Sequence, residues 1–460
     1  MFGNLFGRSG NNKYGGKRNP VRDVSIDQVM LEIKRSRSRA LVIANIGITL
    51  EWYDFFVYGT VAALVFPYYF FPRDVPRELA ALISLITYWL GFVARATGAM
   101  VIGYISDKLG RKVSLVIDLI IMGVATLGIA LVPGYDSIGY LGIAIVSILR
   151  FFQGIALGGE WGAASAFISE LYHDSRYRAF WGSFIQIGVP IGLLMGTALS
   201  AFLINLYGEA LFIQQSWKIL FYIGAAVAVI GGVIRYYVLE SPLFQQILRR
   251  GDISRNPISE AVRRYWRKIL HLMAAKAAQN ALFYVYATYS LIYLTGIGYS
   301  KAEAAIAVTI AALFEAVTEP LGGLIADIIG RRTTLLLGNI AILIYSLLFP
   351  IIILRSPHDI LIASIALGIY GIIHAISFAP QTAYYSELFP TRVRATAIGT
   401  AFQMTTIFAG GLSPIILTLL IGGRYYENWF WLSAIMAAYS IISIIAIIFL
   451  QETKGKELPA

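Results

Sequence analysis

The stretch "GYISDKLGRK" (residues 103–112) returns later in the chain as "GGLIADIIGRR" (322–332). Three of its four charged positions are kept at a constant offset of 220 positions. Asp107 corresponds to Asp327, and Arg111 corresponds to Arg331. A motif that recurs at such a distance indicates an internal duplication rather than a local repeat.

A second pair of segments supports the duplication. "SELYHDSRYRA" (169–179) returns as "SELFPTRVRA" (386–395), so Glu170 corresponds to Glu387 and Arg178 to Arg394. Two independent matches at nearly one offset predict two homologous halves. Paired bundles around a site near the middle of the membrane are a transporter architecture.

The composition is that of an integral membrane protein. The 460 residues are 58% hydrophobic and only 14% charged, with a mean hydropathy of +0.69, whereas a soluble domain carries roughly 25% charged residues. The net charge of +11 raises nucleic acid as a partner, but the basic residues lie in loops between apolar runs, so we expect none. The absence of cysteine excludes disulfides and thiolate chemistry.

Apolar runs long enough to cross a bilayer, about 20 residues each, predict twelve spans. They cover residues 41–71, 79–105, 113–133, 138–168, 179–206, 217–239, 268–295, 302–326, 333–354, 358–384, 395–421 and 429–450. The predicted fold is an all-α membrane protein with two pseudo-symmetric six-helix bundles. The expected divisions are a basic tail (1–39), a first bundle (40–239), a linker (240–267), a second bundle (268–450) and a C-terminal tail (451–460). Ser25 is a candidate cap for a short amphipathic helix in the first tail.

The basic residues predict the orientation. Of the 37 Lys and Arg residues, 27 fall on the side of the N-terminus and only six on the opposite side, with the remainder inside spans. The positive-inside rule therefore places both termini in the cytoplasm, and we expect a multi-pass protein of the cell membrane.

These motifs resemble the major facilitator superfamily over nearly the whole chain. The Gly-x3-Asp-x2-Gly-Arg-Lys/Arg element resembles its general signature. Other stretches resemble its sugar-porter and metabolite:proton symporter branches: "RFFQGIALGGEWGAA" (150–164), "ESP" (240–242), "ELFPTRVRATAIG" (387–399), "QETKG" (451–455) and above all "EWYDFFVYG" (51–59). Two positions depart from the symporter pattern, namely Asn45, which does not directly precede the glutamate, and "RATG" (95–98), where that family has Arg-Pro. The resemblance implies the twelve-helix fold and a protein that works as a monomer.

Two carboxylates in the first span are the main candidates for proton coupling. Glu51 and Asp54 are three residues apart and so share a helical face, with Tyr58 one turn further along. Arg150 lies about 18 Å into the fourth span, at a depth similar to that of Asp54, and Gln153 shares its face. Because a charge in the bilayer centre costs about 2.5–3.5 kcal/mol or more, such residues are functional candidates.

Burial favours the protonated form of a carboxyl, whereas a guanidinium favours the ionised form. We therefore expect Asp54 to bind and release the transported proton, with Arg150 alternating between Asp54 and the substrate, and the resemblance supports both locations. Glu51 is the alternative proton carrier. A static ion pair that only locks the first span to the fourth is the competing interpretation.

Other buried charges widen the candidate site. Apart from Arg235 near the end of the sixth span, the spans contain Arg95, Arg150 and Lys276 against six carboxylates, including Glu315 and Glu319, so full ionisation of these nine residues would leave a net charge of minus three. Some carboxyls are therefore expected to be protonated or to lie near the surface. Arg95 and Glu315 occupy equivalent positions in the two halves, and an ion pair between them is one possibility.

The seventh span offers a polar and aromatic face. Lys276, Gln279, Asn280 and Tyr284 lie at helical spacing, as the wall of a cavity would require, although glutamine and asparagine also join helices in membranes. Gln186, His374 and Gln403 are further mid-span candidates for substrate binding. Pro190 and nearby glycines predict a bend beside Gln186.

The repeated charged motifs are expected to form a gate at the cytoplasmic surface, as they do in the resembled family. Their residues can pair when this side is shut and separate when it opens, which biases the exposed face. The expected gate residues are Asp107, Arg111, Glu170, Arg178 and Glu240 in the first half, and Asp327, Arg331, Glu387, Arg394 and Glu452 in the second.

No phosphate-binding loop or metal-ligand spacing is found in the sequence, so we expect neither an enzyme nor an ATP-driven pump, and no cofactor or metal. The leading hypothesis is a proton-coupled symporter of a small polar metabolite. The cations suit an organic acid, whereas the aromatic residues and carboxylates suit a zwitterion. A sugar transporter, or a receptor that binds a ligand without moving it, remains as an alternative.

Overall fold

The computed structural model describes residues 26–109, 111–158, 160–237, 257–356, 358–390 and 393–459. By its internal contacts the chain divides into two units, Met1–Ala40 and Leu41–Ala460. The second unit holds all the candidate site residues, and the description below concerns that unit. Most of the predicted basic tail, Ser25 included, and most of the predicted linker lie outside the described residues.

Each predicted span corresponds to one helix or to a series of helices separated by short breaks. In the first half, taken here as residues 41–237, the helices are α1 (Ile26–Leu64), α2 (Phe66–Tyr69), α3 (Arg77–Leu109), α4 (Arg111–Leu131), α5 (Tyr135–Ile138), α6 (Leu141–Leu157), α7 (Glu160–Leu171), α8 (Arg178–Gln186), α9 (Gly188–Tyr207), α10 (Glu209–Leu211), η1 (Phe212–Ser216) and α11 (Lys218–Tyr237). In the second half, residues 257–459, they are α13 (Pro257–Tyr284), η2 (Val285–Tyr289), α14 (Ser290–Gly296), α15 (Lys301–Ile329), α16 (Arg331–Arg355), α17 (Ile360–Phe378), α18 (Gln381–Leu388), α19 (Arg394–Thr405), η3 (Thr406–Gly411), α20 (Leu412–Ile421) and α21 (Phe430–Ile448).

Among these helices, seven are long and apolar enough to cross a membrane, or eight if the pair Glu209–Ser216 and Lys218–Ile230, bent by 45°, forms one span. Two shorter apolar helices, Ile117–Leu131 and Leu141–Leu157, add to them. Helix α1, which is described only in part at its side chains, is not among these candidates.

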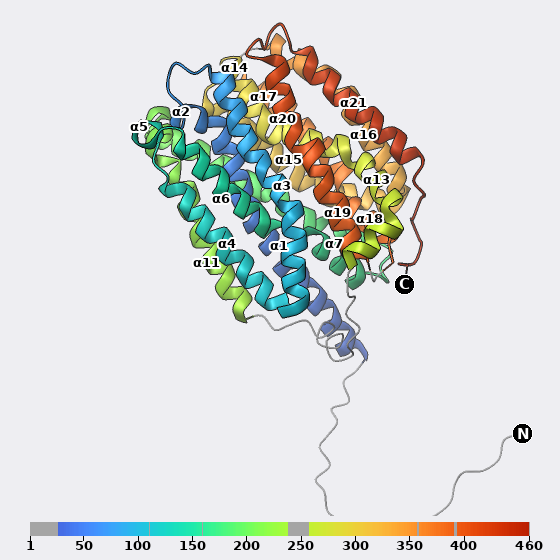
Figure 1. The fold of residues 1–460 in the computed structure, drawn as a ribbon. Coiled ribbons are helices and arrows are strands. Elements are labelled where there is room, and N and C mark those ends of the chain that lie inside the picture. Colours follow the sequence, from blue (N-terminus) through green and yellow to red (C-terminus); the bar gives the residue numbers. More distant parts are fainter. Residues whose placement is uncertain are drawn as a thin grey trace, which may run out of the picture. The chain divides into compact units, whose positions relative to one another are not determined.

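The helix contacts repeat between the halves. In the first half α3 packs on α6 and α4 packs on α11; in the second half α15 packs on α17 and α16 packs on α21 (Figure 1). The halves meet where α15 runs along α8 and α9, and where α3 contacts η3 and α20. The repeated motifs therefore correspond to a repeated set of helix pairings.

Prolines lie at three of the breaks within the spans. Pro190 lacks the N–H that would bond to the carbonyl of Gln186, and α8 ends at Gln186. Pro414 of α20 lies four residues after Gly410, and Gly410 belongs to the π-helical segment η3. Pro380 follows the end of α17. A π-helical segment such as η3 is frequent at functional sites. The three breaks lie beside Gln186, Gln403 and Gln381 in the chain.

Glycines let α3 and α6 pack closely. A Cβ on Gly98 would lie 2.1 Å from the carbonyl oxygen of Ile155, and a Cβ on Gly154 would lie 2.3 Å from the carbonyl oxygen of Gly91. Both obstacles are backbone atoms, which cannot rotate away. The close approach of these two helices positions Arg95 of α3 and Arg150 of α6.

Gly98→Ala is expected to destabilise the protein by about 1–3 kcal/mol, because the added methyl group overpacks a contact made by backbone. Thermal unfolding of the purified protein in detergent measures this as a lower melting temperature. Gly399→Ala is the matched control, since a Cβ there would meet its nearest neighbour, Cα of Gly162, at 3.8 Å. Equal melting temperatures for the two variants would contradict the packing argument.

Candidate functional site

The carboxylate of Asp54 lies in a buried polar cluster of the first half, and its residue is only 3% exposed. Its Oδ2 accepts hydrogen bonds from the hydroxyl of Thr126 at 2.5 Å and from the side-chain amide of Gln153 at 3.0 Å. The same amide donates to Thr126 at 2.8 Å. Glu51, the alternative proton carrier, is only half-buried, so Asp54 is the better shielded of the two.

Arg150 reaches Asp54 through an intervening glutamine rather than directly. Its Nη1 donates to Oε1 of Gln153 at 3.1 Å, and Nε2 of the same amide donates to Asp54. The direct pair expected from the sequence is replaced by an amide bridge, because Gln153 lies one turn beyond Arg150 and offers one acceptor and one donor. Nε and Nη2 of Arg150 have no hydrogen-bond partner within the described residues.

Aromatic rings surround the two buried guanidinium groups. The guanidinium carbon of Arg150 lies 4.2 Å from the ring centre of Phe55 and 4.3 Å from that of Tyr58. Arg95 lies 4.8 Å from the Trp52 ring and hydrogen-bonds to Tyr284. The hydroxyl of Tyr58 donates to Thr87 at 2.7 Å. These rings stabilise the cations while leaving nitrogen atoms available to a ligand.

A second polar cluster lies in the other half. Nζ of Lys276 donates to Oε1 of Gln279 at 2.8 Å and to Oε1 of Gln381 at 3.1 Å. Gln279 in turn contacts Nε2 of His374, and Nδ1 of His374 lies 2.9 Å from Glu315. The structure therefore joins Lys276 and Gln279, which the sequence analysis placed on one helical face, to Glu315 and His374, which it treated as separate candidates.

Three other predicted residues hold helices together in this conformation. Gln186 donates to the carbonyl of Phe378 at 2.5 Å, and Gln403 donates to the carbonyl of Gly158 at 3.1 Å. Both hydrogen bonds join the two halves. Asn280 donates to Thr406 within the second half at 3.3 Å.

The structure differs from the sequence analysis in one pairing. Glu315 lies against His374, and Arg95 lies against aromatic rings and Tyr284. The ion pair considered between Arg95 and Glu315 is therefore wrong for this structure. Glu315 contacts a residue of its own half, whereas Arg95 contacts Trp52 of its own half and Tyr284 of α13.

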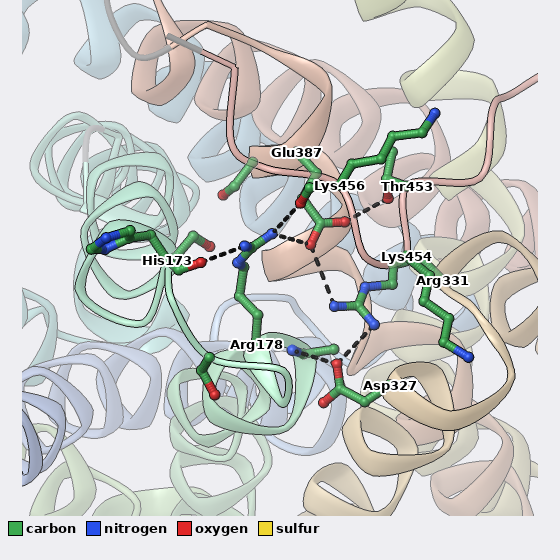
Figure 2. Close-up of polar contacts among 12 residues, drawn as sticks. His173, Arg178, Asp327, Arg331, Glu387, Thr453, Lys454 and Lys456 are labelled. Atoms are coloured by element: carbon green, nitrogen blue, oxygen red, sulfur yellow. Dashed lines mark hydrogen bonds and ion pairs between the residues drawn. The ribbon is translucent and has the colours of Figure 1, made fainter.

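The gate residues form reciprocal ion pairs between the two copies of the second repeat. Arg178 of the first half pairs with Glu387 of the second at 2.7 Å, and Arg394 of the second pairs with Glu170 of the first at 2.6 Å. Figure 2 shows the first pair together with Arg331, which bridges Glu387 at 3.4 Å and Asp327 at 2.7 Å. We call these six residues the gate end of the helices.

Helix ends complete the contacts at the gate end. Asp327 accepts from the backbone N–H groups of Ala179 and Phe180, so a residue of the second half caps α8 of the first. Glu452 accepts from the backbone N–H groups of Arg331 and Arg332, at the start of α16. The side chains of Asp107, Arg111 and Glu240 lie outside the described residues, so their predicted part in the gate is not placed.

The C-terminal segment takes part beyond Glu452, the one residue of it that the sequence analysis placed in the gate. Thr453 is fully buried and donates to Glu387 at 2.5 Å, while Arg178 donates to the carbonyl of Lys456 at 3.3 Å (Figure 2). Sequence reasoning missed Thr453, as it missed Thr126 and Gln381. Threonine often bonds its own helix backbone, so its presence gives no signal of a partner elsewhere.

A pocket of about 750 Å³, part of which is open to solvent, lies at the other end of the helices. Tyr68, Arg77, Glu78, Tyr289 and Tyr425 are among its lining residues. At the same end Lys301 pairs with Glu209 across the halves and lies 4.3 Å from the ring of Tyr68. The central clusters lie between this pocket and the closed gate end.

Comparison with known proteins identifies the family. The model of the Major Facilitator Superfamily matches residues 55–414 and 277–460. The inner membrane metabolite transport protein YhjE of Escherichia coli (strain K12) is 32% identical over 432 residues, covering 92% of this chain and 96% of its own. The proline/betaine transporter of the same strain is 30% identical, covering 96% and 89%.

A solved structure agrees with the fold. The xylose transporter XylE from E. coli, in a partially occluded inward-open conformation, aligns with a TM-score of 0.73 and 18% identity over 92% of this chain and 99% of its own. The predicted resemblance and the predicted fold class are therefore confirmed. The chain belongs to the major facilitator superfamily and is a multi-pass membrane transporter, not an enzyme.

Proposed function

We propose that this transporter is a proton-coupled symporter of a small metabolite that carries a carboxylate, either an organic acid or a zwitterion, and that it works by alternating access. The observation that carries the proposal is the buried chain of contacts from Asp54 through Gln153 to Arg150. It joins a group that can hold a proton to a cation that can hold a substrate.

The amide of Gln153 supplies the coupling. While Asp54 is ionised, Gln153 donates to it and so presents its carbonyl oxygen to Arg150. A protonated Asp54 has an O–H group, which needs a hydrogen-bond acceptor rather than a donor. Gln153 is then held less firmly in the orientation that presents its carbonyl oxygen to Arg150. Arg150 then loses an acceptor and is freer to bind a substrate carboxylate. Proton binding and substrate binding thus favour each other.

The free nitrogen atoms indicate the substrate class. Arg95 and Arg150 each keep two buried N–H groups without a hydrogen-bond partner in the described structure. Guanidinium groups bind carboxylates strongly, often through two hydrogen bonds. The rings of Trp52, Phe55 and Tyr58 beside them suit the cationic end of a zwitterion. Proline and betaine, named for one relative, both combine a carboxylate with a positive nitrogen.

The same feature argues against the alternatives. A neutral sugar offers hydroxyl groups but no charge to balance two buried guanidinium groups, and the likeness to the xylose transporter concerns the fold alone. A receptor that does not move its ligand needs no acid that is linked to the binding cation. A symporter uses both features.

The gate end supports alternating access. Its reciprocal ion pairs close one side of the central clusters, while the pocket lies on the other side. The positive-inside rule places the gate end and both termini in the cytoplasm. In this view the structure is closed toward the cytoplasm, and opening requires the Arg178–Glu387 and Arg394–Glu170 pairs to separate.

Asp54→Asn is expected to abolish uphill uptake driven by an imposed pH gradient in proteoliposomes, because asparagine cannot carry a proton. Exchange of substrate across the membrane should persist, since the substrate cations remain. The radiolabelled substrate is measured inside the vesicles over time. Asp136→Asn, the same change at an exposed position, is the control. Uphill uptake by Asp54→Asn would disprove the assignment.

A thermal-shift screen tests the substrate class at two pH values. Betaine, proline and succinate represent the carboxylates, and xylose represents the sugars. A true ligand at 100 times its Kd stabilises the bound form by about 2.7 kcal/mol. We expect a shift with a carboxylate ligand, and its loss in Arg150→Gln and with the methyl ester of the same ligand. A shift with xylose alone would favour the sugar alternative.

The gate is tested by cysteine labelling, for which the natural chain provides a cysteine-free background. Ser183→Cys introduces a thiol at a fully buried position against Gly323 of the other half. Adding Glu387→Gln should raise its maleimide reaction rate about tenfold or more, because breaking a buried ion pair costs about 3–5 kcal/mol. Glu303→Gln, which alters a half-buried residue of the capping box at the other end of α15, should leave the rate unchanged. Equal rates for all three proteins would argue against a gate here.

A further inference from the structure

The second half contains a buried acidic site that the coupling mechanism at Asp54 does not use. One carboxylate oxygen each of Glu315 and Glu319 and one ring nitrogen of His374 all lie within 4.8 Å of one another. The three residues are 0–1% exposed. Glu315 and Glu319 are one turn apart on α15, and His374 faces them from α17. Lys276 of α13 is the cation that interacts with Glu319.

The hydrogen bonds around Lys276 fix the position of the histidine proton. A lysine ammonium only donates, so Oε1 of Gln279 must be the atom that accepts from Lys276. Nε2 of Gln279 then donates to Nε2 of His374, which must therefore be unprotonated. The proton of a neutral His374 accordingly sits on Nδ1, the atom that lies 2.9 Å from Oε1 of Glu315.

The carboxylates are nevertheless short of partners. Both oxygens of Glu319 and both oxygens of Glu315 are buried without an aligned hydrogen bond, and the approach of Nδ1 of His374 is not aligned either. With His374 neutral, two carboxylates face one ammonium group. An unbalanced negative charge in such a place is costly, so one further positive charge is required.

A proton meets this requirement better than a metal ion. Metal binding at His374 needs a free lone pair on Nδ1, but the contacts above place the ring proton there. The ammonium of Lys276 would also repel a metal ion, whereas a proton shared by two carboxyls leaves the group neutral. Two carboxyls in one site commonly hold a single proton between them.

We propose that Glu315 and Glu319 hold a proton of their own, so that the transporter has a second proton site, in its second half. Its use in coupling rests on the proposed symport, whereas the binding of the proton does not. Lys276 and His374 are the charged or titratable groups that face the pair, with Arg95 acting on Lys276. Across the interface, α8 and α9 present Ser183 and Thr197 to α15.

The site lies where movement would affect it. Helix α15 carries both glutamates and packs along α8 and α9 of the first half. Lys276 lies 4.1 Å from the ring of Phe402, which stacks on Trp161 of the first half. Separation of the halves would therefore admit water to the pair and allow its proton to leave, giving two protons per cycle together with Asp54.

Infrared spectroscopy of the purified full chain at neutral pH tests the proposal, because a protonated carboxyl has a C=O band that a carboxylate lacks. Glu315→Gln and Glu319→Gln should each remove the band of the pair, since the remaining carboxylate is balanced by Lys276. Lys276→Met should enlarge the band, because both carboxyls then take protons. Glu303→Gln, at the start of α15 and away from the pair, should change nothing.

The variants separate this proposal from the role of Asp54. Asp54→Asn should leave the band of the pair in place whether or not it abolishes uphill uptake, so either idea can fail alone. Identical spectra for the wild type and both glutamine variants would overturn the proposal. Loss of the wild-type band on addition of Na⁺ or Zn²⁺, with a raised melting temperature, would also overturn it and indicate a cation site.

Discussion

Charges in the interior of this protein are constrained by the lack of water to solvate them. The membrane interior gives no bulk solvent to a guanidinium, an ammonium or a carboxylate, so each must find its balance among neighbouring side chains. Arg150 and Lys276, one in each half, are fully or almost fully buried. The polar structure of both halves is arranged around these two cations.

The halves solve this problem in the same way. In each, a glutamine three residues after the cation accepts from it and donates onward: Arg150 through Gln153 to Asp54, and Lys276 through Gln279 to His374. An amide suits this position because it has an acceptor and a donor on opposite sides. In the proposed coupling, Gln153 transmits the protonation state of Asp54 to Arg150 without placing opposite charges in direct contact.

An amide bridge also differs from a direct ion pair in its consequences. A guanidinium and a carboxylate in contact in a low-dielectric interior attract each other strongly, and a substrate would have to compete with that attraction. Through Gln153 the attraction between Asp54 and Arg150 is weaker, and two donors of Arg150 remain unused. The static ion pair considered from the sequence would have been a lock, whereas the observed contacts suit a site that changes state.

The sequence predicted the helices well and the contacts less well. The positions of the spans follow from apolar length, and the duplication follows from motifs whose charges repeat at a fixed offset. Depth along a helix also placed Arg150 near Asp54. The rotation and lateral neighbours of each helix do not follow from one sequence, so the pairing of Glu315 with His374 and the contribution of Gln381 were not predicted. The packing of Thr453 was missed because the last residues are polar and have no periodic pattern.

The duplication relates the two ion pairs that join the halves at the gate end. Arg178 and Glu387 come from corresponding segments of opposite halves, and so do Arg394 and Glu170, so one rotation of the halves makes or breaks both pairs together. The cap that Asp327 places on α8 ends with the same movement. The Arg178–Glu387 pair is buried, so it is costly to break, and the simultaneous loss of all these contacts makes the closed state cooperative. A carrier needs this property, because a half-open gate at each end would let protons cross without substrate.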